Sequence, residues 1–256
     1  MFIEERQAKI LELLARDGKV LVKELAEMFA VTEDSIRKDL SALELNGKLK
    51  RTYGGAGSIE QKLQMTEANK RRISDVEAKR KIASAAFRLL RPNQLIYLDI
   101  STINIALAQM LEKTTARFRI LTNMIDVLVM LARNHNIELF FAGGAINQSR
   151  DGFSDALNLE FISHFRPDIS FIGTAGCHIT KNSLSTHDTN DALHKARMIE
   201  LSKFSCIVAE SRKIEVEANY CFAPLAAADA LITDAALKSD LLDKAEKLGV
   251  NVISAE

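Results

Sequence analysis

The sequence predicts an α/β protein in which a small winged helix-turn-helix precedes a larger α/β domain with a mostly parallel sheet. Two observations lead to this prediction. Residues 1–57 hold three short amphipathic helices and a glycine-rich segment, whereas residues 76–256 alternate apolar strands with helices. A chain of 256 residues is long enough for a small domain joined to a larger one. We therefore expect domains over 1–57 and 76–256, with a linker over 58–75.

The composition is that of an ordinary globular protein, with 47% hydrophobic and 27% charged residues. No run of about eighteen apolar residues occurs, and the charged start MFIEERQAKI does not fit a signal peptide. These features predict a cytoplasmic protein without a membrane span. The formal net charge is zero, so any basic surface has to come from local clusters. Three scattered cysteines without a CxxC pair predict buried, reduced thiols rather than disulfides or a zinc site.

The first domain has the helix spacing of a helix-turn-helix. Apolar side chains recur at helical intervals from Ile3 to Leu14, and a second, shorter helix ends before Val31. Thr32 can cap a third helix, whose apolar stripe runs to Leu45. Only a few residues separate the second helix from the third, which allows the later helix to enter the major groove of DNA. Base contacts are then expected at its exposed start, from Ser35, Arg37 and Lys38, with Glu33 and Asp34 as possible acceptors.

A β-hairpin wing is predicted directly after the third helix. The segment KLKRTYGGAGSI has Leu49 and Tyr53 as apolar anchors and three glycines that permit a tight reversal. Its basic side chains, from Lys48, Lys50 and Arg51, would lie along the phosphate backbone. Such contacts position a protein on DNA without reading its sequence.

The string ELAEMFAVTEDSIRKDLSALELNGKLKRTYGGA resembles the signature of the DeoR family of bacterial transcriptional regulators. That signature runs roughly V-S-x-x-T-I-R-R-D-L, then L-x-x-x-G-x-L, then R-x-x-G-G-A. Thr32 stands at its Ser position, Ser35 at its Thr and Lys38 at its second Arg. The remaining positions match outright, namely Ile36, Arg37, Asp39, Leu40, Gly47, Arg51, Gly54, Gly55 and Ala56. The resemblance implies that this domain binds operator DNA, with Thr32 and Tyr53 among its contact residues.

The larger domain has six candidate strands, separated for the most part by helical stretches. Continuous apolar strands that alternate with helices predict a parallel sheet covered on both faces. In such sheets ligands bind beyond the carboxyl ends of the strands. The candidate strands are residues 95–99, 118–122, 137–144, 168–173, 204–210 and 230–234.

Polar and small residues follow the first three of these strands. Backbone amides at a helix start, together with hydroxyl groups, form an anion site, so residues 99–102 can hold a phosphate group. The alternative is that Ser101 and Thr102 only cap the following helix. The strand-end residues are Asp99, Ser101 and Thr102, then Thr122 and Asn123, and finally Gly143 and Gly144.

The effector domain of the DeoR family is similar to a sugar-phosphate isomerase scaffold of the ribose-5-phosphate isomerase type. Its pattern is D-x-G-T-T after the first strand, T-N after the second and G-G after the third, followed by a Gly, a Lys and a late S-K. The resemblance implies effector contacts from Asp99, Thr122, Asn123, Gly143, Gly144, Gly152, Lys195 and Lys213, to which Thr102 could add a hydroxyl and Arg150 a charge.

The loop after the first strand departs from this pattern. Ser101 replaces the family's Gly and Ile103 its second Thr, while Glu210 stands where an Asp is usual and Arg212 precedes Lys213. Losing the glycine restricts how closely a ligand can approach the backbone, and losing the hydroxyl removes a donor. The departures predict an unusual or more weakly bound effector.

Taken together, these patterns and resemblances predict a transcriptional regulator, namely a repressor of a carbohydrate-utilisation operon. Its expected partners are double-stranded operator DNA and a small phosphorylated sugar, and palindromic operators favour a homo-oligomer, either a dimer or a tetramer. One alternative is a sugar-phosphate isomerase fused to a DNA-binding head, with Asp99, Asp188 and Lys195 as acid-base groups. Another is an architectural DNA binder without an effector. Because no acid-base pair can be assigned, no catalytic residue and no enzymatic role are predicted.

Two further clusters support no site, so no metal and no cofactor are predicted. His187, Asp188, Asp191 and His194 could surround a metal, but they open a helix where capping and surface residues are expected. Cys177 and His178 are adjacent in sequence, and adjacent side chains rarely face each other as a nucleophile and its base would.

Overall fold

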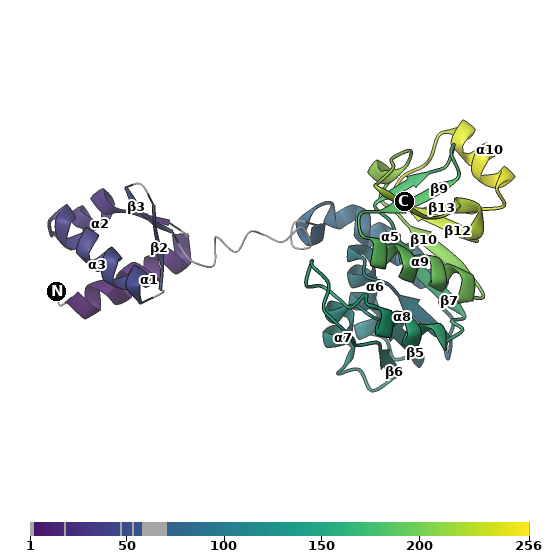
Figure 1. Ribbon diagram of the computed structural model, residues 1–256, viewed down its shortest axis with the longest axis horizontal. Coiled ribbons are helices and arrows are strands. Elements are labelled where there is room, and N and C mark those ends of the chain that lie inside the picture. The colour runs from purple at the N-terminus through teal and green to yellow at the C-terminus, as the bar shows by residue number, and fades with distance from the viewer. Residues whose placement is uncertain (1–2, 18, 47, 53, 58–70, 256) are drawn as a thin grey trace. The chain divides into compact units, whose positions relative to one another are not determined.

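A computed structural model describes residues 3–17, 19–46, 48–52, 54–57 and 71–255. The chain divides into two compact units, Met1–Thr66 and Glu67–Glu256 (Figure 1). The residues of the predicted linker that are described, 71–75, belong to the second unit. Within the described residues no helix is long and apolar enough to cross a membrane.

The first unit is a three-helix bundle with a small antiparallel sheet, and the winged helix-turn-helix is confirmed. Its core consists of apolar side chains from all three helices, among them Ile10, Leu25, Ile36 and Leu40. The strands pair in the order β1-β3-β2, and the first of them was not expected from the sequence. The elements are α1 (Ile3–Asp17), β1 (Lys19–Leu21), α2 (Val22–Phe29), α3 (Glu33–Leu45), β2 (Lys50–Thr52) and β3 (Gly55–Gly57).

A buried ion pair fixes α3 against α1. The Arg6 guanidinium donates to the Asp39 carboxylate at 2.5 Å, and Gln7 donates to the same carboxylate at 3.3 Å. Both charged side chains are less than 10% exposed. Asp39 therefore orients α3 from inside the unit and leaves the opposite face of this helix open to solvent.

A glycine allows strand β3 of the wing to pack closely against β1. Gly55 lies on β3 between β1 and β2, and a side chain at this position would collide with the backbone carbonyl of Val20. Only glycine allows β3 to approach β1 this closely. This contact gives a physical reason for the second glycine of the Gly54-Gly55 pair.

The second unit is built on a seven-stranded sheet of order β13-β12-β10-β7-β4-β5-β6, and every pairing in it is parallel. The predicted α/β class with a mostly parallel sheet is therefore confirmed. A smaller antiparallel sheet, β11-β9-β8, lies beside it. The large sheet comprises β4 (Leu95–Leu98), β5 (Phe118–Thr122), β6 (Ile137–Phe141), β7 (Ile169–Gly173), β10 (Ser205–Val208), β12 (Ala230–Thr233) and β13 (Asn251–Ser254), and the small one β8 (Gly176–His178), β9 (Ser183–Thr186) and β11 (Tyr220–Ala223).

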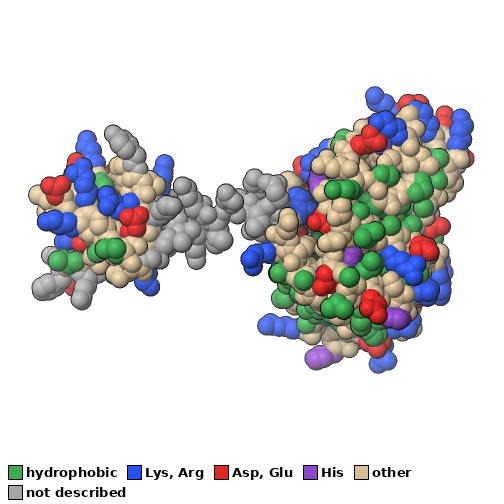
Figure 2. Space-filling model, viewed as in Figure 1, with side chains coloured by type: hydrophobic (Ala, Val, Ile, Leu, Met, Phe, Trp, Pro, Cys, Tyr) green, Lys and Arg blue, Asp and Glu red, His purple; other side chains and the backbone are tan. Residues whose placement is uncertain are grey.

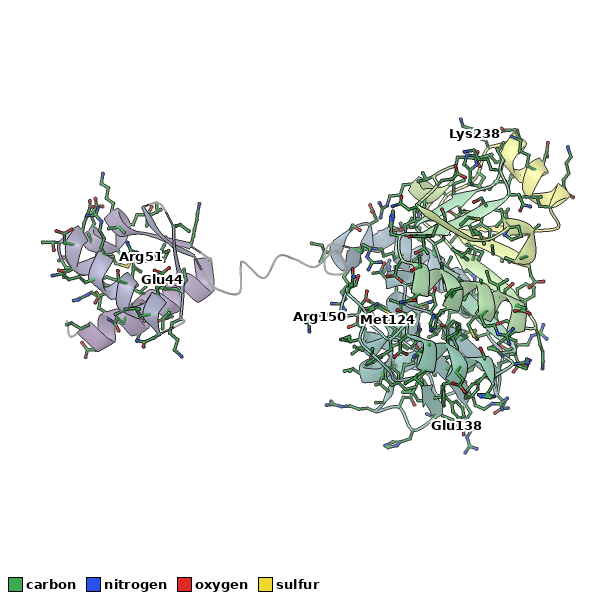
Figure 3. The ribbon with its side chains drawn as sticks, viewed as in Figure 1. Glu44, Arg51, Met124, Glu138, Arg150 and Lys238 are labelled. Carbon is green, nitrogen blue, oxygen red and sulfur yellow. The ribbon has the colours of Figure 1, made fainter. Side chains whose placement is uncertain are left out.

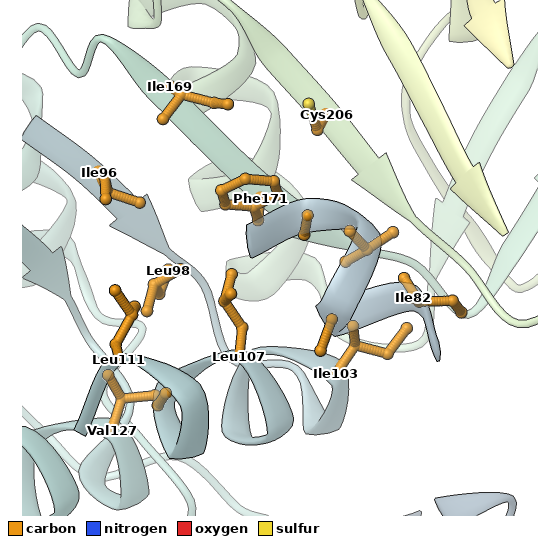
Figure 4. Close-up of a cluster of buried hydrophobic side chains, with 14 of the residues drawn as sticks. Ile82, Ile96, Leu98, Ile103, Leu107, Leu111, Val127, Ile169, Phe171 and Cys206 are labelled. Atoms are coloured by element: carbon orange, nitrogen blue, oxygen red, sulfur yellow. The ribbon is translucent and has the colours of Figure 1, made fainter. Parts of the chain in front are cut away.

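Helices cover both faces of the large sheet. Alternate residues of β4 enter separate cores, with Ile96 and Leu98 on one face and Tyr97 on the other. The core of the first face includes residues of α5, α6 and α7 (Figure 4), and that of the second face residues of α8, α9 and α10. The helices are α5 (Val76–Arg88), α6 (Thr102–Glu112), α7 (Ile125–Leu131), α8 (Ala156–Ser163), α9 (Thr189–Leu201) and α10 (Ser239–Lys247), with short 3-10 turns η2 (Ser211–Lys213) and η3 (Leu225–Ala227).

Candidate DNA-binding and effector sites

The start of α3 exposes Thr32, Arg37 and Lys38, which were predicted to contact DNA, while Ser35 is half-buried. Thr32 caps the helix by accepting from the backbone amide of Ser35 at 3.3 Å. Arg37 and Lys38 are exposed, and Arg37 forms ion pairs within its own helix, with Glu33 at 2.7 Å and Asp34 at 3.0 Å. Basic and acidic side chains are interspersed on the visible face of this unit (Figure 2). The guanidinium of Arg37 is therefore held within reach of solvent at the amino end of the helix.

The predicted wing contacts are described in part. Lys48 is exposed, and the side chain of Lys50 and the whole of Tyr53 lie outside the described residues. The backbone amide of Arg51 donates to the Glu44 carboxylate at 2.9 Å (Figure 3), and its guanidinium donates to the Ser41 hydroxyl at 2.7 Å. The wing is thus tied to α3, and the two elements form one surface.

The order of the large sheet places a topological switch point between β4 and β7. The chain runs from β4 outward to β5 and β6, then returns to β7 on the other side of β4. Ligands of open α/β sheets bind at the carboxyl ends of strands at such a point. The candidate effector residues Asp99, Ser101 and Thr102 follow β4 directly.

Asp99 and Lys195 form a buried ion pair at this switch point. The Lys195 ammonium contacts the Asp99 carboxylate and lies 3.0 Å from Asp191, while the amide of Gly173 donates to Asp99 at 2.9 Å. Asp99 is 2% and Lys195 3% exposed. Asn104, fully buried, also donates to Asp99, at 2.7 Å. Lys195, which the resemblance placed among the effector contacts, is therefore already paired inside the unit.

The charges of this cluster shift one another's ionisation. Burial raises the pKa of Asp99 to about 6, and Asp191 adds to the rise while Lys195 opposes it. Burial acts to lower the pKa of Lys195, but Asp191 and Asp99 together raise it above its ordinary value. Lys195 consequently stays charged at neutral pH and offsets the negative charge of the buried Asp99.

Ser101 caps α6, as one of the two alternatives for this loop predicted. Its hydroxyl accepts from the amide of Ile103 at 3.3 Å. The backbone of Ser101 has φ −148°, an extended conformation that does not require the family's glycine. Ile103 is 1% exposed and packs into the core. Thr102 is half-buried and lines a groove of about 710 Å³ together with residues of α5, α6 and α7.

Thr122 and Asn123 organise the end of β5 through their own side chains. The Thr122 hydroxyl donates to the carbonyl of Leu98 at 2.7 Å, which joins β5 to β4. Asn123 accepts from the Tyr97 hydroxyl at 3.2 Å and donates to the carbonyl of Phe153 at 2.8 Å. Both residues are almost completely buried, so their side chains brace the strand ends.

The loop after β6 presents backbone rather than buried side chains. Gly143 and Gly144 are exposed, and the φ of Gly144 is +152° with the Asp155 carboxylate where a side chain would stand. Gly152 pairs with Met124 across an isolated bridge, and Arg150 is exposed with φ +55° (Figure 3). The predicted strand ended at 144, but β6 ends at Phe141 because the chain turns away to form this loop.

Lys213 belongs to a charged group after β10. Its ammonium donates to the carbonyl of Thr174 at 3.0 Å and lies 2.8 Å from Glu210, which is 1% exposed. Burial acts to raise the pKa of Glu210, but Lys213 and Arg212 lower it below its ordinary value. Lys213 thus lies at the strand ends with Asp99, although it already has a carboxylate partner.

The remaining clusters are structural. Asp188 caps α9 by accepting from the amide of Asp191 at 2.8 Å, as expected, but His194 is buried rather than on the surface. Cys177 and Cys206 are buried, and burial raises the pKa of each thiol to about 12. Cys221 is exposed, contrary to the prediction for all three cysteines. Among the described residues no group of His, Cys, Asp or Glu could hold a metal ion.

Two residues around Asp99 and Lys195 were not predicted from the sequence. Asn104 lies inside α6, where the sequence pattern does not distinguish it from an ordinary polar helix residue. Its side-chain amide nevertheless donates both to Asp99 and, at 2.9 Å, to the carbonyl of Phe171. Asp191 completes the pairing of Lys195 from one helical turn away. An acid four residues before a lysine on one helix is the pattern that could have indicated this pair.

Comparisons with known proteins match both units. Residues 6–62 match the family model of the DeoR-like helix-turn-helix domain, and residues 74–235 that of the DeoR C-terminal sensor domain. The regulator YulB of Bacillus subtilis (strain 168) is 32% identical over 93% of this chain and 91% of its own length. The glycerol-3-phosphate regulon repressor of Escherichia coli (strain K12) is 29% identical over 90% of both chains. Ribose 5-phosphate isomerase A of Methanocaldococcus jannaschii aligns over 55% of both chains at 14% identity, with a TM-score of 0.41.

A helix-turn-helix unit followed by a sensor unit defines a DNA-binding transcriptional regulator. The chain belongs to the DeoR family of these regulators, as the motif in residues 24–56 predicted.

Proposed function

We propose that this chain represses a carbohydrate-utilisation operon, that α3 and the wing bind double-stranded operator DNA, and that a small phosphorylated sugar bound at the strand ends of the second unit controls this binding. The observation that carries the proposal is that one chain combines an exposed, polar α3 with a sensor domain whose parallel sheet has a topological switch point. The name of the Escherichia coli relative, a glycerol-3-phosphate regulon repressor, supports a phosphorylated effector.

Operator recognition is assigned to the amino end of α3. Thr32, Ser35, Arg37 and Lys38 lie on or beside the first turn, while Ile36 and Leu40 are buried and fix the helix. Arg37 can bind a guanine bidentately once it leaves its acidic neighbours. Lys48, Lys50, Arg51 and Tyr53 would contact the phosphate backbone from the wing.

Effector recognition is assigned to the loops around the switch point. Exposed backbone at Gly143 and Gly144, the Thr102 hydroxyl at the amino end of α6 and the cations Arg150 and Lys213 supply the donors that a phosphate group requires. Asp99, Ser101, Thr122, Asn123 and Lys195 are buried and support these loops from below. Gly152 joins the same group through its pairing with Met124.

The operator is expected to be palindromic and the protein a dimer or tetramer, because symmetric half-sites are bound by symmetric proteins. Sedimentation of the full chain with and without operator DNA would give the number of copies bound.

The proposal is tested by binding of the purified protein to the intergenic DNA upstream of its own gene, with excess random competitor. Glucose 6-phosphate, fructose 1-phosphate and glycerol 3-phosphate are added in turn, with the unphosphorylated compounds as controls. We expect a specific complex that one phosphorylated compound releases or tightens. A specific complex that none of them alters would contradict the effector class, and the absence of any specific complex would contradict the assignment of α3.

One observation favours a second function, isomerisation of a sugar phosphate. Asp99, with a pKa of about 6, and Lys195 lie in contact, as a general acid and base would. Their burial below 5% exposure keeps both groups from a substrate, which favours the regulator. Turnover of pentose or hexose phosphates that is lost in Asp99→Asn would support the enzyme.

A further inference from the structure

The chain enters the second unit through residues 71–75, which charged side chains hold to the strand-end loops. We name residues 71–75 the clasp segment. It immediately precedes α5, and the chain on its amino-terminal side leads to the DNA-binding unit. Each loop that it contacts also carries residues assigned above to the effector.

The clasp segment contacts the ends of β5 and β6 through two arginines. Arg71 lies 3.2 Å from the Asp151 carboxylate, in the loop that carries Arg150 and Gly152. Asp151 is 3% exposed, and its carbonyl accepts from the amide of Ile125 at the start of α7. Arg72 forms an ion pair with Asp126, also at the start of α7. The two arginines therefore contact the loop after β6 and the helix that follows Asn123.

A buried lysine holds the segment from below. The ammonium of Lys79 donates to the backbone carbonyls of Arg71 and Ser74, and it lies 3.7 Å from the carboxylate of Glu210. Both Lys79 and Glu210 are less than 5% exposed. Because Glu210 also pairs with Lys213, the clasp segment and the loop after β10 share one buried charge network.

Asp75 lies at the end of this network. Its φ of +47° and ψ of +42° are left-handed, a conformation that is uncommon outside glycine and that Asp adopts more readily than most residues. Its carboxylate does not cap α5 but lies 3.0 Å from Arg212. Arg212 contacts Glu210 as well, at 3.3 Å. Loss of the Asp75–Arg212 contact would let this residue relax.

We propose that the clasp segment couples the two units, because an anion bound at the strand ends competes with Asp75 and Glu210 for Arg212 and Lys213 and thereby loosens the segment that leads to the DNA-binding unit. This inference rests on the proposed function for the identity of the anion. Its energetic consequence is reciprocal, since an effector that loosens the clasp binds more tightly to a protein whose clasp is already open.

The first test uses the full chain without any effector. The variant Asp75→Asn/Asp126→Asn removes the carboxylate of Asp75 in the clasp segment and that of Asp126, which pairs with Arg72, and neither residue is among those assigned to the effector. The matched control is Glu77→Gln, which removes an exposed carboxylate of α5 whose ion pair among the described residues is with Arg80 in its own helix. Hydrogen exchange is followed at residues 71–80 and 147–153, and operator affinity by fluorescence anisotropy.

We expect faster exchange at both sites in the double variant, together with an operator affinity that differs from wild type by about fivefold or more. Glu77→Gln should match wild type in both measurements. An operator affinity equal to that of wild type overturns the proposal, whether or not exchange increases.

A second test reverses the charges of Arg72 and Asp126, which distinguishes the effect of their ion pair from the effect of changing either residue alone. Arg72→Asp and Asp126→Arg should each alter operator affinity, and their combination, which restores an ion pair of reversed polarity, should return it toward wild type. Failure of the combination to recover, in a protein whose β4 and β5 amides stay protected from exchange, counts against the clasp.

Addition of glycerol 3-phosphate and glucose 6-phosphate distinguishes this inference from the proposed function. If neither compound alters operator binding by the wild type, the proposed effector class is wrong. The comparison of wild type with the double variant in the absence of effector still tests the role of the clasp segment. If one of them does, the clasp requires that its effect shrink in Asp75→Asn/Asp126→Asn.

Discussion

Arg37 illustrates how a single side chain can be prepared for a base contact. Its guanidinium is exposed and pairs with Glu33 and Asp34, so the proposed base contact would require it to exchange these partners for a base. We predict that Arg37→Ala weakens cognate operator binding by about 1 to 3 kcal/mol and leaves random DNA little affected. Fluorescence anisotropy with both DNAs checks this expectation.

Arg80→Ala is the matched control for Arg37, because Arg80 is also an exposed helical arginine paired with an acid three residues away. Its affinity for operator should equal that of wild type. Equal losses on cognate and random DNA in Arg37→Ala would instead make Arg37 a phosphate contact.

His194 is predicted to make the stability of the second unit depend on pH. Burial lowers its pKa, while the Asn190 carbonyl at 2.7 Å and Asp191 oppose the shift. In the unfolded chain the imidazole of His194 binds a proton below its ordinary pKa of about 6.5, whereas in the folded protein it binds this proton only at lower pH. The contribution of His194 to the free energy of unfolding should therefore fall as the pH decreases from about 7 to about 5, whereas Asp99, whose pKa is raised to about 6, contributes in the opposite direction over the same range.

Urea unfolding at several pH values measures this dependence. His194→Gln should make the free energy of unfolding fall less between about pH 7 and about pH 5 than it does in wild type, whereas His135→Gln, at an exposed position, should leave this dependence as in wild type. A curve that His194→Gln leaves unchanged would contradict the assignment to His194.

At the scale of elements, the position of α3 depends on a buried ion pair that is not part of the proposed DNA-binding surface. The Arg6–Asp39 pair is buried, and removal of one member of such a pair costs about 3 to 5 kcal/mol because the other charge is left uncompensated. We predict that Asp39→Ala destabilises the DNA-binding unit by about this amount. Chemical denaturation followed by circular dichroism measures the loss.

The control for Asp39 is Lys9→Gln, which removes an exposed ion pair with Glu12 on the same helix α1. Exposed pairs contribute about 0 to 1 kcal/mol, so this variant should stay close to wild type. Similar effects of the two substitutions would show that burial does not decide the strength of the Asp39 contact.

Elements with a clear periodicity could be predicted from the sequence. The three helices of residues 3–45 and the strand 118–122 were expected close to their observed positions, because helix caps and continuous apolar strands are local signals. The strands β8, β9, β11 and β13 were not expected. The first three are short strands of a separate antiparallel sheet, and β13 is only partly buried at the edge of the large sheet.

The sequence indicated where the strand-end residues lie in the sheet but not which partners they contact. The parallel sheet brings Asp99 and Thr122 to one edge, as the sequence indicated. Burial of Lys195 depends on how α9 packs against the sheet, and the role of Asn104 depends on β7, which lies 67 residues further along the chain. Such contacts between distant segments leave no periodic signal in the sequence.

The whole molecule has separate hydrophobic cores in its two units. The first is formed by residues between Ile10 and Ala56, and the cores of the second begin at Ile82. Each unit can therefore unfold by itself, and multidomain chains of this kind depart from a single two-state transition.

We predict two transitions in the thermal unfolding of the full chain, which two ligands move separately. A ligand that binds only the folded form stabilises its unit by RT ln(1 + [L]/Kd), about 2.7 kcal/mol at a concentration of one hundred times Kd. Specific operator DNA should raise one transition, the one that Asp39→Ala lowers. A phosphorylated effector should raise the other, and any smaller shift of the first would measure the coupling between the units. A single transition raised equally by both ligands would contradict independent units, because it would require the two cores to unfold together.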